Sequence, residues 1–230
     1  MPNFAQRSEE LELMDAPDLS ERDLREMLDE LAFINTALGG YGVSLRGLKA
    51  LMPRACERLR VLDVGTGGGD VPRHMVSWAA RRGIDATVHG IDLSDATVAY
   101  AREKTGGIAG LTFSESDLHD LEGENEYDVV HTALTLHHFD DSRAPEMLRK
   151  MFALCRWGVV INDLHRHPLA YHSIALLTKV FSRSEFIRND APLSVLRAFR
   201  RSELFDLAAR AGVPRPRITW HWAFRWLVVF

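Results

Sequence analysis

The feature that most constrains the fold is a short apolar segment that runs into closely spaced glycines and then into a helical pattern. It reads VLDVGTGGGD over residues 61–70. Glycine lets the backbone turn sharply and lets a ligand approach it closely. The helix that follows offers unpaired N–H groups and the positive end of its dipole. This arrangement is typical of a cofactor site at the end of a β-strand.

The spacing of the glycines narrows the choice of cofactor. A dinucleotide-binding loop follows G-x-G-x-x-G. Its third glycine would fall on Asp70 if counted from Gly65, and on Pro72 if counted from Gly67. The glycines instead follow G-x-G-x-G, and the acid at position 70 would repel a pyrophosphate. A P-loop is excluded because no Gly-Lys-Ser/Thr follows.

Downstream of the glycines, short apolar runs alternate with helical patterns. Such alternation favours a parallel sheet covered by helices on both faces. We expect Ser94 and Ser142 to be helix N-caps and Gly83 to stop a helix. Strands are predicted over 60–64, 86–91, 111–116, 127–132 and 158–163, and helices over 71–82, 95–103 and 143–154.

The chain begins and ends with further elements. Leucine, methionine and isoleucine recur at helical spacing over 20–38, with Ser20 as the expected cap and Gly39-Gly40 as the end. A second helix is predicted over about 44–59. Residues 164–199 are expected to form an inserted helical pair, 201–212 a helix, and 217–230 a hairpin at the sheet edge. The tryptophans of that hairpin are expected in the core: Trp220, Trp222 and Trp226.

Composition and charge exclude several classes of protein. The 230 residues are 46% apolar and 26% charged, as in globular proteins, and the net charge of −4 disfavours a nucleic-acid binder. Two cysteines cannot build a disulfide framework. The N-terminus lacks a signal-peptide pattern, and no apolar run reaches the ~20 residues of a membrane span. We therefore predict a cytoplasmic protein with a single domain over 1–230, as a monomer or homodimer.

Charge is unevenly distributed along the chain. Residues 8–30 hold ten acids and two arginines, a net of −8, and residues 151–230 hold twelve bases and five acids, a net of +7. Two solvated helix faces would account for this pattern. Alternatively, the acidic arm docks on the basic part of the same molecule or of a partner subunit.

Two acids follow the next strands. Asp92 is expected at the carboxyl end of the strand over 86–91, where a carboxylate can accept hydrogen bonds from both hydroxyls of a ribose. Asp117 ends the following strand, where an acid can receive the exocyclic amine of an adenine while Leu118 packs on its ring. Both acids would lie at the same sheet edge as the glycines.

Taken together, these motifs resemble the class I S-adenosylmethionine-dependent methyltransferases. The resemblance covers roughly residues 60–163 and includes the run TALTLHHF over 132–139, which is similar to a segment of small-molecule, quinone-methylating relatives. It implies a Rossmann-like α/β fold with a seven-stranded, mostly parallel sheet whose last strand is antiparallel. In this scheme residues 1–59 form a helical lid, 60–163 the cofactor-binding core, 164–200 a helical cap insert, and 201–230 the final helix and edge hairpin.

The resemblance also implies S-adenosyl-L-methionine as the cofactor and assigns residues to it. Asp63 and the glycines would hold the methionine part, Asp92 the ribose and Asp117 the adenine. The predicted cofactor-binding residues are Asp63, Gly65, Thr66, Gly67, Gly69, Asp92, Leu93, Asp117, Leu118 and Thr132.

Histidines after the fourth and fifth strands are the candidates for chemistry. A methyltransferase must align the acceptor with the S–CH3 bond and remove a proton when the acceptor needs it. His137 and His165 are the predicted catalytic pair. His138 is a predicted substrate contact, and Asp163 is predicted either to orient a histidine or to contact the substrate. His89 and His131, within or near strands, are expected to be packed core residues.

Other chemistries fit the sequence less well. Residues 133–135 offer no acid for a catechol-type metal site, so no metal is predicted. The Asn/Asp-Pro-Pro-Tyr signature of amino-directed nucleic-acid enzymes is absent after Val130, and Cys56 and Cys155 are too few for arsenic methylation. A small phenolic, pyrone or quinone-like acceptor remains, with O-methylation ahead of C-methylation. A non-catalytic S-adenosylmethionine-binding protein and an NAD-dependent reductase stay open.

Overall fold

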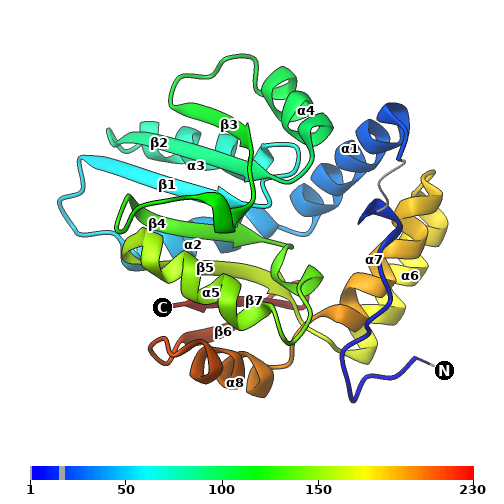
Figure 1. Ribbon diagram of the computed structural model, residues 1–230. Helices are drawn as coiled ribbons and strands as arrows, with labels where there is room; N and C mark the ends of the chain where they lie inside the picture. Colours follow the sequence, from blue (N-terminus) through cyan, green and yellow to red (C-terminus); the bar gives the residue numbers. More distant parts are fainter. Residues whose placement is uncertain (1, 16–18) are drawn as a thin grey trace.

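The computed structural model describes residues 2–15 and 19–230 and contains a seven-stranded sheet (Figure 1). The strand order is β3-β2-β1-β4-β5-β7-β6. Neighbouring strands are parallel except where β7 meets β5 and β6. The predicted Rossmann-like architecture with an antiparallel last strand is confirmed. The strands are β1 (Arg58–Val64), β2 (Asp85–Asp92), β3 (Leu111–Glu115), β4 (Tyr127–Ala133), β5 (Cys155–Leu164), β6 (Arg217–His221) and β7 (Arg225–Val229).

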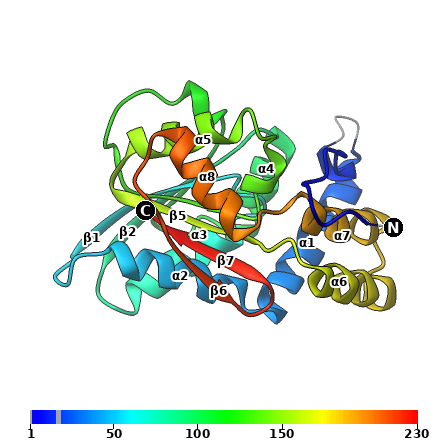
Figure 2. The same ribbon diagram turned by 90° about the horizontal axis from the view of Figure 1, so that it is seen from below.

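Helices cover both faces of this sheet, as Figure 2 shows. On one face α2 (Gly40–Leu51) and α3 (Asp70–Ala80) pack against apolar side chains of β1, β2 and β4. On the other, α5 (Ala144–Leu154) and α8 (Arg201–Ala211) bury a second core. The helix α4 (Asp95–Thr105) packs beside β3. Burial of both sheet faces explains why the central strands are almost continuously apolar.

Three helices and the N-terminal segment gather at the edge where the parallel strands end (Figure 1). They are α1 (Glu21–Ala37), α6 (Pro168–Phe181) and α7 (Glu185–Arg197). Short 3-10 turns occur at η1 (Leu13–Asp15), η2 (Leu118–Asp120) and η3 (Leu136–His138). Apolar side chains of α1 pack against Tyr100 of α4 and Ile187 of α7, so the stripe of α1 is buried over this edge.

Most predicted elements lie within a few residues of their expected bounds. Ser20 caps α1 by accepting a hydrogen bond from the Asp23 N–H, and Ser94 caps α4 through the N–H of Thr97. The acidic arm predicted over 8–30 is described in part, since residues 16–18 lie outside the described ranges. Across the described residues, none of the helices combines the length and apolar character that a membrane crossing requires.

Three local expectations were wrong. The second helix spans Gly40–Leu51 rather than 44–59, because the chain re-enters a helix directly after the left-handed Gly39, and Pro53 follows its end. Ser142 is not a cap, since Asp140 accepts the N–H groups of Ser142 and Arg143 instead. Of the three tryptophans, only Trp226 is buried. Trp220 and Trp222 are 48% and 71% exposed because β6 is an edge strand and the turn projects beyond it.

Candidate active site

The glycine loop joins β1 to α3 and requires glycine on conformational grounds. Gly65, Gly67 and Gly69 have φ values of 67°, 53° and 75°, in the left-handed region that side chains rarely adopt. A Cβ on Gly65 would also lie 2.4 Å from Cγ2 of Thr135. The loop therefore packs closely on the segment after β4. The backbone at Gly67 stays open, because the side-chain atom nearest to a Cβ placed there is Cδ2 of Leu28 on α1, at 3.9 Å.

Asp63 lies beneath this loop and is almost fully buried. One carboxylate oxygen accepts a hydrogen bond from Oγ1 of Thr66 at 2.9 Å, and the other lies 2.6 Å from Nδ1 of His131. His131 also contacts Ser44 Oγ at 2.9 Å, so it is the packed, satisfied core residue that was expected. In this arrangement Asp63 and Thr66 fix the loop from below. Their predicted contact with the cofactor stays a prediction.

Asp92 ends β2 and faces the same loop. Its Oδ2 accepts a hydrogen bond from the Gly67 N–H at 3.0 Å, and its Oδ1 accepts one from the Ser94 N–H at 3.3 Å. Burial raises the pKa of Asp92, although these backbone donors oppose the shift. A carboxylate in this place is held beside the open face of the glycine loop, where a ribose could replace or extend the backbone contacts.

The other predicted cofactor residues occupy different environments. Leu93 is 68% exposed directly after Asp92, and Asp117 caps η2 by accepting the His119 N–H at 2.9 Å. Leu118 is buried in the core under α5, and Thr132 is buried with its hydroxyl donated to the Val64 carbonyl at 2.9 Å. The last two therefore hold the fold at this edge, and none of the four assignments is tested by these contacts.

His137 and Asp163 form a buried pair at the ends of β4 and β5. Nδ1 of His137 lies 2.6 Å from Oδ1 of Asp163, and the His137 backbone N–H donates to Oδ2 at 3.1 Å. Burial raises the pKa of Asp163, but the His137 ring and these hydrogen bonds outweigh it and hold the pKa below its usual value. The sequence named both residues, and the structure brings them together with Asp163 in the orienting position.

Residues that the sequence did not single out surround this pair. Glu12 from the N-terminal segment is buried with its Oε1 3.6 Å from Nε2 of His137 and its Oε2 3.8 Å from Nε2 of His138. Arg197 of α7 lies 3.7 Å from Glu12 Oε1, and Arg7 donates to the His137 carbonyl at 2.9 Å. These contacts join positions more than 50 residues apart, so no local pattern could reveal them.

His165 lies in a separate, aromatic environment. Its ring packs 4.5 Å from Trp226 and 5.3 Å from His167, and its Nδ1 is buried without a hydrogen-bond partner among the described residues. Burial, together with the charges of His167, Arg200 and Arg166, lowers the pKa of His165 to about 4. The ring is therefore neutral at pH 7 and a weak proton acceptor, which makes His137 the better placed of the two candidate bases.

Acidification is expected to destabilise the fold partly through His165. Its pKa falls from 6.5 to about 4 on folding, so the unfolded chain takes up the proton first. The contribution of the neutral His165 ring to the free energy of unfolding is fully present above pH ~6.5. It is lost as the pH falls toward 4. For a half-buried ring we expect about 1–2 kcal/mol. Urea unfolding of the wild type and His165→Leu at pH 7 and 4.5 measures it. Equal pH dependence of both proteins would contradict this origin.

An apolar cavity of about 340 Å³ lies between α1 and α6. Phe33 and Ile34 line it from α1, and Leu177 and Phe181 from α6, while Asp29 and Glu30 supply its acidic lining. None of the predicted histidines lines it. Phe33 and Ile34 lie about 8 Å beyond Leu28 along the axis of α1. The cavity thus adjoins the elements that were predicted to roof an acceptor pocket.

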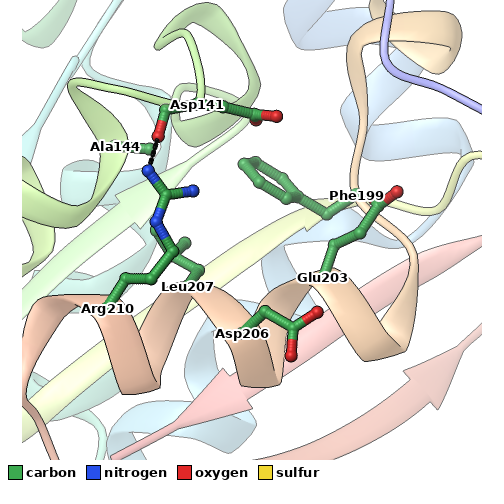
Figure 3. A pocket seen from close by; sticks show the side chains of 7 residues that line it. All are labelled: Asp141, Ala144, Phe199, Glu203, Asp206, Leu207 and Arg210. Carbon is green, nitrogen blue, oxygen red and sulfur yellow. Dashed lines mark hydrogen bonds between the residues drawn. The ribbon is translucent and has the colours of Figure 1, made fainter.

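A smaller cavity of about 140 Å³ lies between α8 and the start of α5 (Figure 3). Its acidic side chains Glu203 and Asp206 project from α8, and Arg210 donates a hydrogen bond to the Asp141 carbonyl across it. None of the predicted site residues lines this cavity.

Comparisons with known proteins agree with this geometry. Residues 61–158 match the model of a methyltransferase domain. The chain is 22% identical over 160 residues to YqeM of Bacillus subtilis (strain 168), whose name assigns it provisionally to the methyltransferases. That match covers 68% of this chain and 58% of the length of YqeM.

Solved structures share the fold. A SAM-dependent methyltransferase from Aquifex aeolicus aligns with a TM-score of 0.64 at 18% identity, covering 92% of this chain and 98% of that one. Human N-acetylserotonin methyltransferase in complex with SAM gives a TM-score of 0.64 at 18% identity, covering 91% of this chain and 56% of that one.

The domain match and the sheet topology agree with each other. Residues 61–158 match a methyltransferase domain, and the chain has the class I fold of S-adenosylmethionine-dependent methyltransferases. The residues present fit S-adenosylmethionine, because the glycine backbone is open at Gly67 and the partly buried Asp92 carboxylate lies beside it.

Proposed function

We propose that the protein transfers the methyl group of S-adenosylmethionine to a hydroxyl of a small phenolic, pyrone or quinone-like acceptor, with His137 as general base. The observation that carries this proposal is the buried pair of His137, in the turn after β4, and Asp163, near the end of β5, whose Nδ1 and Oδ1 atoms are 2.6 Å apart. Thr135, two residues before His137, contacts the Gly65 carbonyl at 3.4 Å, so the base is tied to the cofactor loop.

The proton chemistry follows from the pair. Because the Asp163 carboxylate accepts a hydrogen bond at Nδ1, the tautomer with a free lone pair on Nε2 is favoured. Nε2 would then take the acceptor's hydroxyl proton, while the cofactor held beside the glycine loop would supply the methyl group and leave as S-adenosylhomocysteine. Asp163 stabilises the resulting imidazolium. The bound cofactor supplies an already activated methyl group, so positioning accounts for much of the remaining rate.

The acceptor's apolar body would occupy the cavity between α1 and α6. Its apolar lining suits an aromatic or alkyl group. Glu12 covers Nε2 of His137 in this structure, so we infer that the N-terminal segment moves when an acceptor enters. His138 and Asp163 are proposed as acceptor contacts, and His165 as a second candidate base whose low pKa weakens that role.

C-methylation of a quinone-type ring is the alternative reaction at the same site, because a carbon nucleophile needs the same alignment and the same base. We also propose that the enzyme acts in the cytoplasm as a monomer or homodimer, without nucleic acid as a substrate. A small-molecule acceptor is supported by the name of a solved structure that shares the fold, human N-acetylserotonin methyltransferase.

A screen of phenols, pyrones and hydroquinones with methyl-labelled S-adenosylmethionine tests the proposal. We expect label on an oxygen of at least one acceptor class, located by mass spectrometry of the product. Label on a ring carbon would favour the alternative reaction. Cofactor binding without transfer to any acceptor would favour a non-catalytic binding protein.

Replacing Asp92 by alanine is expected to weaken cofactor binding at least about tenfold, or about 1.4 kcal/mol. The physical reason is the loss of charge-assisted hydrogen bonds to the ribose, each worth ~1.5–3 kcal/mol. Asp92→Asn is the matched control, since it keeps an oxygen for the Gly67 N–H but loses the charge and the second acceptor, which the Ser94 N–H uses. Calorimetric titration gives the affinities, and unchanged affinity in a folded alanine variant would rule out the ribose assignment.

A further inference from the structure

The N-terminal segment and the turn after β4 bring three potential metal ligands together. Glu12, His137 and His138 each offer one ligand atom, and these atoms lie within 4.8 Å of one another. Glu12 and His137 are buried, with His138 partly so. The two segments are 125 residues apart in sequence, so the fold alone creates this cluster.

The spacing of the ligand atoms fits a metal ion. In a tetrahedral zinc site with bonds of ~2.0–2.1 Å, neighbouring ligand atoms are about 3.4 Å apart. The carboxylate oxygens of Glu12 lie 3.6 Å from Nε2 of His137 and 3.8 Å from Nε2 of His138. Taken with one ligand atom from each residue, the three atoms lie within 4.8 Å of one another, so shifts of at most about 1.4 Å would bring them to the tetrahedral spacing.

The surroundings hold the ligands in place. Asp163 lies 2.6 Å from Nδ1 of His137, the partner that typically orients a metal-binding histidine and raises its basicity. The carbonyl of His138 accepts a hydrogen bond from Arg197 at 2.7 Å. Nε of the same arginine lies 3.7 Å from Oε1 of Glu12. The other carboxylate oxygen, Oε2, faces Nε2 of His138. These contacts fix the backbone and rings from which the ligands project.

We infer that Glu12, His137 and His138 form a binding site for a divalent transition-metal ion such as Zn²⁺. Two imidazoles and one carboxylate suit zinc or cobalt, whereas Mg²⁺ and Ca²⁺ prefer all-oxygen sites. Three protein ligands leave a fourth coordination position. The expectation of no metal concerned a catechol-type site at residues 133–135 and 162–163, which this cluster does not use.

The site has a consequence that rests on the proposed function. A metal ion on Nε2 of His137 takes the lone pair that would accept the acceptor's proton. The ion would also clamp the N-terminal segment over the base through Glu12. Metal binding should therefore inhibit methyl transfer, because the ion and the acceptor's proton compete for the same lone pair.

The test uses the full chain without a histidine tag, and Co²⁺ as a spectroscopic probe. We expect one equivalent of Co²⁺ to give visible absorption bands of tetrahedral intensity, displaced by Zn²⁺. Affinity should fall at least about 100-fold in Glu12→Ala and in His138→Ala. Glu9→Ala, which removes an exposed carboxylate of the same segment, and Cys56→Ser should bind like the wild type.

Two results would overturn the site: absence of a stoichiometric Co²⁺ spectrum, or a wild-type spectrum and affinity in both ligand variants. If Glu12→Ala does not fold by circular dichroism, His138→Asn replaces it. The spectra are recorded without cofactor or acceptor, so their outcome is independent of whether methyl transfer occurs. Once an acceptor is identified, full activity of the zinc-loaded enzyme would contradict the expected inhibition through Nε2 of His137. The metal site itself would still be supported by the Co²⁺ spectra.

Discussion

Replacing His137 by alanine should lower the turnover of the acceptor by about 10²–10⁴-fold and leave cofactor affinity nearly unchanged. The variant removes the imidazole that the buried Asp163 orients at 2.6 Å, and with it the proton acceptor. Single-turnover measurements with saturating labelled cofactor isolate the methyl-transfer step, and calorimetry checks the affinity.

Two further variants test the roles of Asp163 and His165. Asp163→Asn keeps the shape of the pair but removes the charge that stabilises the imidazolium, so its turnover should also fall. His165→Ala should retain more activity than His137→Ala, because the pKa of His165 is about 4. Near wild-type turnover in both histidine variants would show that the acceptor ionises without either ring and that positioning alone carries the reaction.

Deleting residues 1–38 should abolish acceptor turnover while leaving a folded sheet and weakening cofactor binding less. The deletion removes α1, which supplies one wall of the 340 Å³ cavity and places Leu28 beside Gly67. The sheet keeps its two main cores, which lie under α2, α3, α5 and α8. Circular dichroism, cofactor titration and the acceptor assay together measure the three parts of this expectation.

A double variant controls for the size of that deletion. Phe33→Ala combined with Ile34→Ala changes only the cavity wall contributed by α1. It should reduce kcat/KM for the acceptor without a comparable change in cofactor affinity. Full activity in the truncated chain would show that the arm and α1 are a solvated or oligomer-forming helix rather than a lid.

The fold could be predicted closely because its signals are local. The period of the apolar residues, the glycine loop and caps such as Ser20 and Ser94 each depend on neighbours within a few residues. The helix over Gly40–Leu51 was misplaced because its glycines look unfavourable in a helix. At the start of the helix, a Cβ on Gly40 would clash with Oδ1 of Asn35 on α1, so close packing requires glycine there.

The candidate site could be predicted only in part. Asp92, His137 and Asp163 were found because each lies at or just after the carboxyl end of a strand, and the ends of parallel strands meet at one edge. Glu12 and Arg197 carried no such signal, since their roles depend on how the N-terminal segment crosses α7 and the turn after β4. The same holds for Arg225, a buried guanidinium whose partners Asn35 and Asn162 come from α1 and β5.

Calorimetric titration with S-adenosylmethionine, S-adenosylhomocysteine and NADH tests the central claim most directly, because it requires no knowledge of the acceptor. The G-x-G-x-G loop, the carboxylate of Asp92 beside Gly67 and the acid at position 70 predict stoichiometric binding of both sulfur compounds and none of NADH. Binding of NADH without binding of S-adenosylmethionine would contradict the account.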